Sequence, residues 1–504
     1  MSKRSLTGAV RFDRGIIGLR DSAFHQHFDI FSDPTRLIPY RSTEAEADGT
    51  SAANLGTYDL RHFLLGKNGL IYALGVKSTF PQIMQKTDPT TGTWAESTTA
   101  IGNAVRITGC FIEWAGALWM FSGTTNVSKY VIATNTFTNT VATVGTITTT
   151  AQAVVGADDN MYMFYNNKVV KVSPAGAVTD NYLTNLPSDM RIVSACRWGS
   201  YIAIGMAYGT SATASPTGVS KVFIWDMVTT TTVNDVIDWG EGALMVLGNI
   251  EGRIVGVSNK YLETPSGLTS LALGQGSMVV RLWAGATAQV QKEIVANQVV
   301  TLGRFIRDVV VKDNRMFWVA SVPFGASTST ESTYHLGIWA FGRKDVNSNF
   351  ALSLDYVEEG VDTANYKINS FGAAGSYWFI NHGASGLISK TDDAANYTFT
   401  SIYETEIFWD GKETNKIVGL TVTTEALPSA GTITVKYKKD AETSFTTIYT
   451  DGTDDSLRYS AMNVESTGIE LPSYKRLRLR IESTGGAVVT GLFFLREQVA
   501  DDKY

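Results

Sequence analysis

Near the C-terminus, basic and apolar residues alternate over Lys475–Arg480. In a β-strand, successive side chains point to opposite faces, so Arg476, Arg478 and Arg480 would share one face while the intervening leucines pack into a core. Guanidinium groups in such a row can bind phosphate, sulfate or an acidic protein surface. We therefore identify the row as a candidate anionic-partner surface. Three further residues that would extend the same surface are Lys436, Lys438 and Lys439.

A simpler role for this row is a soluble sheet face that resists edge-to-edge association. The guanidinium groups would then pair with acids from the same part of the chain. The acids that we expect opposite them are Asp454, Asp455 and Glu465. The sequence is compatible with both roles.

His25, His27 and Asp29 form a second pattern, which resembles a set of metal ligands. Alternate positions of a strand share one face, so the three side chains could converge. Zinc sites need three or four ligands at characteristic spacings, and no fourth ligand follows nearby. We therefore expect neither a metal nor a cofactor.

The familiar motifs of nucleophilic and phosphoryl chemistry are missing from the sequence. It contains no Gly-x-Ser-x-Gly elbow, no phosphate loop and no His-Glu-x-x-His. Glycoside hydrolysis would need two carboxylates across a pocket, and the sequence does not show which acids converge. We therefore expect a non-enzymatic protein. The candidate acids, whose ordinary roles would be in turns, caps or a solvated rim, are Glu113, Asp226, Asp308, Glu358 and Glu359.

The elements that would position these residues repeat along the chain. Seven times, an apolar strand ends at a Gly, Asn or Asp turn and a second apolar-aromatic strand follows at once. Equivalent positions in the second strands lie 40 to 62 residues apart, at Leu70, Leu118, Met161, Tyr201, Ile254, Met316 and Tyr377. Self-similarity at this period, with three or four short strands per unit, is typical of β-propeller blades. We predict an irregular β-propeller of about seven blades over residues 59–403. The long interval before Met316 leaves room for an irregular extra sheet around Met278–Trp283.

Segments of different character flank the repeats. Residues 404–504 contain strands that alternate apolar and polar positions between Gly-rich turns, which predicts a small antiparallel β-sandwich, jelly-roll-like in type. Residues 1–58 are irregular, and two prolines exclude a central strand over Asp33–Tyr40. We expect an extended N-terminal arm there, docked on a partner subunit or on the propeller rim. The predicted fold class is all-β throughout.

Composition limits the classes of partner. The net charge is -6 and the isoelectric point is near 5.5, so the chain is not built to coat nucleic acid beyond a local basic patch. No stretch approaches the ~20 apolar residues of a membrane helix, and the first residues do not form a signal peptide. Cys110 and Cys196, the two cysteines, lie in apolar strand patterns and are expected to be buried free thiols, typical of a chain made in a reducing compartment.

The order of these parts resembles bacteriophage virion proteins of the tail, nozzle and adhesion type. The resemblance is carried by Phe28–Tyr40 in the arm, by the irregular blades, and by Ile481–Ala487 with Gly491–Phe493 near the end. It implies a non-enzymatic structural protein, a tail or vertex component that forms homo-oligomers through symmetric subunit contacts and binds other virion proteins. It also implies assembly in the bacterial host cytoplasm and a place in the virion.

Two other functions are compatible with the sequence. One is a host-glycan-binding adhesin, a receptor-binding protein for host attachment. Its insertion loops or C-terminal sandwich would bind the glycan, with Tyr208 and Trp239 as loop aromatics that could stack on sugars. The other is a propeller glycoside hydrolase or lyase with a carboxylate or Tyr/His cluster in the central funnel. Sugar binding by residues 59–403 or 404–504 would favour the adhesin.

Overall fold

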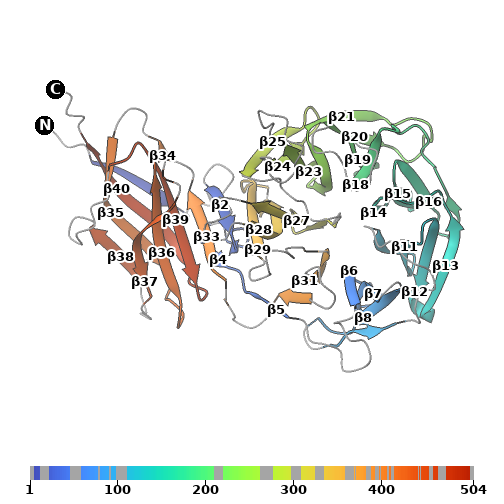
Figure 1. Ribbon diagram of the computed structural model, residues 1–504, viewed down its shortest axis with the longest axis horizontal. Coiled ribbons are helices and arrows are strands. Elements are labelled where there is room, and N and C mark those ends of the chain that lie inside the picture. The colour runs from blue at the N-terminus through green and yellow to red at the C-terminus, as the bar shows by residue number, and fades with distance from the viewer. Residues whose placement is uncertain are drawn as a thin grey trace, which may run out of the picture.

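Strands follow one another throughout the described part of the chain in the computed structural model (Figure 1). The part of the chain that the structure describes holds no α-helix, only a single 3₁₀ turn at Ile132–Thr134, and hence no helix able to span a membrane. The structure describes residues 5–11, 22–33, 35–45, 58–77, 80–89, 92–97, 110–208, 219–261, 276–296, 308–323, 334–344, 346–357, 368, 370–381, 388–391, 397, 399–405, 408–409, 414–440, 442, 444–452, 458–463 and 473–499.

Four-stranded antiparallel groups, each paired in chain order, make up most of the molecule. The first three are β6 (Tyr58–Leu65), β7 (Ile71–Lys77), β8 (Phe80–Lys86) and β9 (Ala95–Glu96); β10 (Phe111–Trp114), β11 (Ala117–Ser122), β12 (Asn126–Val131) and β13 (Thr136–Thr143); and β14 (Thr150–Val155), β15 (Met161–Tyr165), β16 (Lys168–Val172) and β17 (Val178–Thr179). The next three are β18 (Met190–Trp198), β19 (Tyr201–Tyr208), β20 (Val219–Trp225) and β21 (Asp235–Glu241); β22 (Ala243–Ile250), β23 (Arg253–Tyr261), β24 (Gly276–Trp283) and β25 (Gln289–Ala296); and β26 (Val310–Lys312), β27 (Arg315–Pro323), β28 (Tyr334–Gly342) and β29 (Ala351–Val357).

A last group, β30 (Ser370–Ala374), β31 (Tyr377–Asn381) and β32 (Ile388–Thr391), takes its outer strand from the N-terminal part of the chain, β5 (Thr43–Ala45). In Figure 1 the groups stand around a common centre, with β6, β14 and β18 innermost and β13 and β21 at the rim. We call this arrangement the ring. It confirms the predicted all-β class and a propeller-like arrangement of four-stranded sheets. The long interval before Met316, which left room for an irregular extra sheet around Met278–Trp283, holds none among the described residues there, because β24 is the third strand of an ordinary group.

The repeated turn signal has a backbone cause. The first hairpin of each group turns at a residue whose φ is positive, between 57° and 83°. Tight hairpins need this left-handed conformation, which glycine, asparagine and aspartate adopt most easily. The residues are Gly69, Gly116, Asp159, Gly199, Gly252, Asn314 and Gly375. The sequence repeat is thus a repeat of turn geometry.

Buried clusters join neighbouring groups in chain order. One cluster, for example, holds Phe164 of β15 together with Ile204 of β19. The last group packs on the first, where the Phe379 ring stacks on Phe63 at 5.7 Å between ring centroids. A single sheet cannot bury both of its faces, so the ring is stable only as a closed unit.

The sheet of β26–β29 does not end at the rim of the ring. Strand β2 (Ser22–Gln26) pairs with β29 in parallel and with β33 (Ser401–Thr405) in antiparallel fashion. The same sheet continues through β39 (Arg476–Thr484), β36 (Thr432–Lys439) and β37 (Thr446–Asp451), and β34 (Phe408–Trp409) pairs with β39 off this path. Hydrogen-bonded strands therefore run from the centre of the ring into the C-terminal part of the chain.

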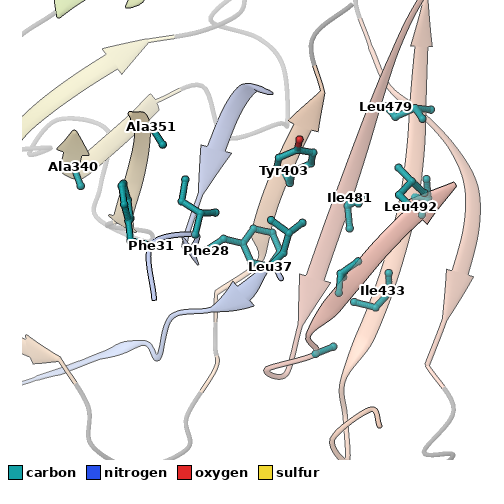
Figure 2. Close-up of a cluster of buried hydrophobic side chains, with 14 of the residues drawn as sticks. Phe28, Phe31, Leu37, Ala340, Ala351, Tyr403, Ile433, Leu479, Ile481 and Leu492 are labelled. Carbon is teal, nitrogen blue, oxygen red and sulfur yellow. The ribbon is translucent and has the colours of Figure 1, made fainter. Parts of the chain in front are cut away.

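A second sheet completes the C-terminal part. It consists of β1 (Ser5–Arg11), β40 (Val489–Val499), β35 (Thr414–Thr424) and β38 (Arg458–Asn463), in that order. Buried side chains of both layers share one core, among them Leu479 and Ile481 from one sheet and Leu492 from the other (Figure 2). Val422 of the second sheet belongs to the same core. We call the two layers the C-terminal unit.

The segment expected as an extended arm is built into this architecture. Strands β1, β2 and β5 enter three different sheets, and β3 (Phe28–Asp29) pairs only with β4 (Ile38–Pro39). The prolines permit no longer strand in that run. We call the described residues between Ser5 and Ala45 the strap, because they pass from the C-terminal unit to the ring.

Candidate functional site

Strand β39 presents the predicted row of arginines. Leu477 and Leu479 are buried at 1% and 0% exposure, while Arg476 is exposed and Arg478 and Arg480 are partly exposed. The alternation of the sequence therefore produces the expected division between a core face and an outer face. We call the outer side of β39 and β36 the basic face.

Strand β36 adds two lysines to the basic face. In the register of the two strands, Lys436 lies opposite Arg480 and Lys438 lies opposite Arg478. Like charges directly opposite one another destabilise a sheet unless counter-charges are present. The basic face thus needs acidic partners, from the chain itself or from a ligand.

Two glutamates of the same sheet supply part of this counter-charge. Arg480 donates from Nε and Nη2 to Glu404 Oε1 at 2.9 and 2.6 Å, and Arg478 Nη1 lies 3.6 Å from Glu404 Oε2. Lys436 Nζ lies 2.8 Å from Glu482 Oε1. Glu404 comes from β33, which adjoins β39. The acids expected in this role, Asp454, Asp455 and Glu465, lie outside the described residues.

An aromatic ring completes the basic face. The Arg480 guanidinium and the Lys438 ammonium lie 4.0 and 4.8 Å from the centre of the Phe445 ring. Five cations thus share this face with the two carboxylates. Nε of Arg478 is buried and has no hydrogen-bond partner among the described residues. Chemically, the face can bind an anionic group, chiefly through the arginines that Glu404 does not fully neutralise.

The expected sharing of one strand face by His25, His27 and Asp29 is wrong, because the strand breaks between them. His27 has φ 58° and separates β2 from β3, so the period of two is lost. The Asp29 carboxylate accepts hydrogen bonds from the backbone N–H groups of Phe31 and Ser32. The described residues include no group of three potential metal ligands.

His27 instead joins the strap to the ring. Its backbone N–H donates to Leu354 O at 2.7 Å, its Nδ1–H donates to Asp355 O at 3.1 Å, and its own carbonyl accepts from Tyr40 N–H and from Ser401 Oγ. Burial lowers the pKa of His27 to about 4. The imidazole is therefore neutral under ordinary conditions.

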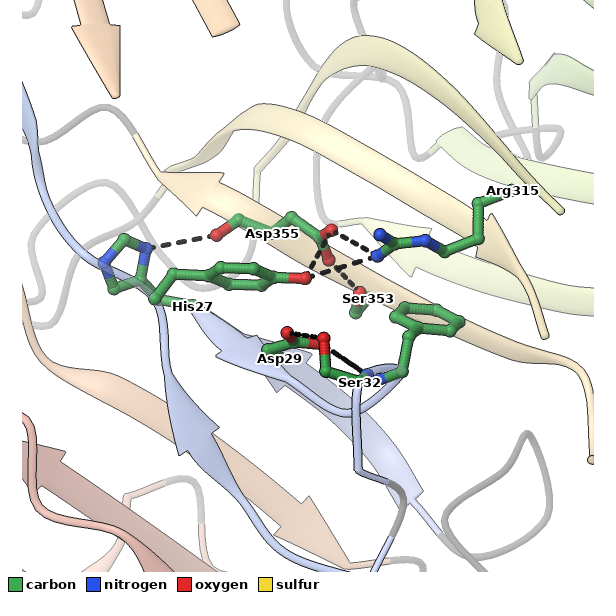
Figure 3. Close-up of polar contacts among 8 residues, drawn as sticks. His27, Asp29, Ser32, Arg315, Ser353 and Asp355 are labelled. Atoms are coloured by element: carbon green, nitrogen blue, oxygen red, sulfur yellow. Dashed lines mark hydrogen bonds and ion pairs between the residues drawn. The ribbon is translucent and has the colours of Figure 1, made fainter. Parts of the chain in front are cut away.

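Asp355 is the centre of a buried polar network beside His27 (Figure 3). Its Oδ2 accepts from Tyr40 Oη at 3.0 Å and from Arg315 Nη1 at 3.3 Å, and its Oδ1 accepts from Ser353 Oγ. Burial raises the pKa of Asp355 to about 6, against the opposing effect of Arg315. No local sequence pattern marks this network, because its members lie some 300 positions apart along the chain.

A second polar cluster lies where the last groups of the ring meet the first. His62 Nδ1–H and Ser370 Oγ both donate to the Asp308 carboxylate at 2.7 Å, and the His62 backbone N–H donates to Ser370 Oγ at 2.6 Å. The serine hydroxyl bonds to the carboxylate and not to the imidazole, so the arrangement differs from a serine–histidine nucleophile. His62 adopts φ 57° at a bulge of β6.

The other candidate acids do not join this cluster. Glu113 accepts from Lys67 N–H in a neighbouring turn, and Asp226 caps its own turn by accepting from Val228 and Thr229 N–H. Glu358 and Glu359 lie outside the described residues. Thus none of the described candidate acids is brought beside another.

The two aromatic residues expected in loops both lie in strands. Trp239 is 1% exposed within β21 and packs between neighbouring groups, so a sugar-stacking role is wrong for it. Tyr208 ends β19 and is 48% exposed. Cys110 is buried, Cys196 is partly buried, and burial raises the pKa of both thiols to about 12.

Comparison with known proteins adds no family. No family model matches, and no curated protein matches. Among solved structures, the chain is similar to the extracellular domain of a putative hybrid two-component system from B. thetaiotaomicron, with 11% identity and a TM-score of 0.44 over 81% of this chain and 47% of that one. The chain therefore spans about half the length of that protein.

Two lyases are also similar in structure. Oligogalacturonate lyase in complex with manganese has 8% identity and a TM-score of 0.40 over 70% of this chain and 95% of that one. Virginiamycin B lyase from Staphylococcus aureus has 8% identity and a TM-score of 0.39 over 70% and 99%. At such values the matches carry no argument about this chain.

Proposed function

We propose that the chain is a non-enzymatic structural protein of a bacteriophage virion, a tail or vertex component that makes symmetric contacts with other copies and with other virion proteins. In finer detail, we propose that the ring is a seven-bladed β-propeller and that the C-terminal unit is a jelly-roll-like β-sandwich. The observation that carries the proposal is the continuous sheet from β26 to β37, which joins the two parts.

A joint of this kind suits a structural protein whose two parts must not move relative to one another. Domains that meet only through side chains usually move relative to one another. Here β2 is hydrogen-bonded to β29 on one side and to β33 on the other, and Phe28 and Leu37 fill the core beneath it at 0% exposure. Any bending at this joint would break main-chain hydrogen bonds and expose apolar surface. A rigid two-part body supports the role of a platform within a particle.

The solution mass of the purified full chain tests this proposal. We expect a defined oligomer by light scattering, and rings or other closed particles of one size by electron microscopy, because virion subunits of this kind act through symmetric contacts. A chain that stays at the monomer mass of 54.7 kDa at every concentration would contradict the proposal. Deletion of residues 1–58 is unsuitable as a control, since it would remove strands from three sheets.

The basic face favours a second function, attachment to an acidic host surface glycan. Its arginines and the Lys438–Phe445–Arg480 stack would bind carboxylate or sulfate groups while offering an apolar surface to a sugar ring. Exchanging both Arg476 and Arg478 for glutamine should weaken binding of an anionic hexasaccharide by at least about tenfold, given ~1.5–3 kcal/mol for each charged hydrogen bond.

A neutral hexasaccharide and one matched variant control the glycan experiment. Arg197→Gln removes one exposed positive charge from the ring instead of the C-terminal unit, so it should leave binding unchanged. Equal affinity of the parent chain for the anionic and neutral hexasaccharides would rule out this second function.

A further inference from the structure

The strap resembles a bound peptide more than a folded part of the chain. Within itself it pairs only through the two-residue strands β3 and β4. Its other described strands pair with partners more than 300 positions away: β1 with β40, β2 with β29 and β33, and β5 with β32. Nearly all of its order therefore comes from surfaces made by the rest of the chain.

The site that holds the strap is apolar in its middle. Phe28, Ile30, Phe31 and Leu37 are between 0% and 5% exposed. They belong to the cluster that also contains side chains of the ring and of both C-terminal layers (Figure 2). Burial of four large apolar side chains makes this site a strong one.

Polar contacts fix the position of the strap along this site. Leu37 exchanges backbone hydrogen bonds with Val489 at 2.9 and 3.1 Å. Arg36 pairs with Glu425, and the Tyr40 hydroxyl donates to Asp355 at 3.0 Å. The sequence Phe28–Tyr40 thus matches the site residue by residue, so a segment of the same sequence from another copy would fit equally well.

The order of synthesis allows a strap to meet the site of a second copy before its own site is complete. The strap is made first, whereas β33, β39 and β40, which complete its site, come at the end of the chain. At ~5–20 residues per second the strap waits tens of seconds for its own site. During that time, a newly finished neighbouring chain whose own strap has not yet docked offers the same site in an open state.

We propose that copies of this chain exchange their straps in the assembled state, so that the strap of one copy occupies the site of its neighbour. The inference rests on the proposed structural function, since it names the partner of each subunit as a second copy and the contact as strand exchange. Exchange costs little because every hydrogen bond and buried contact is preserved. Twelve residues, 46–57, separate the strap from β6 and set the reach between copies, at most about 40 Å.

Disulfide trapping distinguishes exchanged from unexchanged straps. Glu44 of β5 lies opposite Lys390 of β32, and directly paired strand residues are close enough for a disulfide. One chain carries Glu44→Cys and a second carries Lys390→Cys, and the two are coexpressed and mildly oxidised. Exchange places the two cysteines of different chains opposite one another, so we expect a reducible product of twice the chain mass in the oligomer fraction, which neither variant gives when it is expressed alone.

Three controls make the result specific. The parent chain should give no product, since burial raises the pKa of Cys110 and Cys196 to about 12 and leaves their thiols unreactive. A chain with both substitutions reports the unexchanged form as an internal disulfide at the single-chain mass. The pair Ser5→Cys and Glu497→Cys repeats the experiment at the other end of the strap, in case the first pair fails to fold.

The outcomes separate this inference from the proposed function. Cross-linked pairs in the oligomer support exchange. An oligomer in which only internal disulfides form overturns exchange and leaves the structural function standing. A chain that is monomeric at every concentration overturns the structural function, and with it the exchange of straps in an assembly.

Discussion

The junction between strap and ring should respond to acid through two buried groups that act in opposite directions. His27 and Asp355 are each 1% exposed and share a hydrogen bond. Burial lowers the pKa of His27 from 6.5 to about 4 and raises the pKa of Asp355 from 3.8 to about 6. Each shift makes the free energy of docking the strap depend on pH.

In the parent protein, the effects of His27 and Asp355 on the pH dependence of strap docking nearly cancel. His27 must stay neutral in the docked state, so its share of the stability is present above pH 6.5 and is lost as the pH falls to 4. Asp355 binds its proton more tightly when docked, so its share is present below pH 3.8 and is lost as the pH rises through 6. At ~1.36 kcal/mol for each pKa unit, each share is about 3 kcal/mol.

Removing either group should reveal the pH dependence that the other group contributes to the free energy of strap opening. In His27→Asn, which keeps a residue that tolerates positive φ, the free energy of strap opening should rise by about 3 kcal/mol between pH 6.5 and 4, because only Asp355 titrates. In Asp355→Asn it should fall by about as much over the same range. In the double variant, the free energy of opening should show neither trend. Both single variants also lose hydrogen bonds, so the slope with pH is the readout and not the absolute value.

Hydrogen exchange of the strap measures this local opening, since a chain of this size need not unfold in one step. The Leu37 amide group donates to Val489 O, which lies outside the strap, so its exchange reports the undocking of the strap. Rates between pH 4 and 7 are divided by the intrinsic rate at each pH. Strand β15, in the ring, serves as the internal control. If the free energy of strap opening varies with pH in the same way in both single variants as in the parent protein, the two groups are not coupled to docking and the reasoning is refuted.

Three further variants test the core, the ring closure and the basic face. Leu37→Ala should lower the free energy of unfolding by about 2–5 kcal/mol by calorimetry or denaturant titration, whereas Val346→Ala, 67% exposed, should change it by less than about 0.5 kcal/mol. Gly372→Ala would press its Cβ against the Phe63 carbonyl oxygen of the first group and should lower the melting temperature sharply. Gly375→Ala would place its Cβ in open space, and only its positive φ costs about 1 kcal/mol. Arg480→Gln should destabilise the C-terminal unit by about 3 kcal/mol in urea, since it leaves a poorly exposed carboxylate without its main partner.

The ring could be predicted because its signal is local. A hairpin that turns at a left-handed residue can be recognised from a few neighbouring positions, such as Asp159 before Met161. The same turn recurs in every group, so even irregular spacing did not hide it. The alternation over Lys475–Arg480 was equally local, and it placed the arginines on the outer face of β39.

The strap could not be predicted because its partners are distant in sequence. Residues Ser22–Gln26 show no alternation that marks them as a central strand. Their two neighbours, β29 and β33, come from the other end of the chain, so no nearby residues indicate the pairing. The same limit applies to the counter-charge of the basic face. Glu404 pairs with Arg480 only because β33 adjoins β39, and that neighbourhood is a property of the sheet order.

Strand β33 links the features that matter most for function. On one edge it pairs with the strap, where Phe24 lies opposite Glu404, and on the other edge the same Glu404 lies opposite Arg480. The Glu404 carboxylate also offsets part of the charge of the basic face. An anionic partner that draws Arg480 away from Glu404 would therefore leave a poorly exposed carboxylate on the strand that holds the strap in place. Binding at the basic face and docking of the strap are thus joined through one residue, and ligand and strap should influence one another's affinity equally.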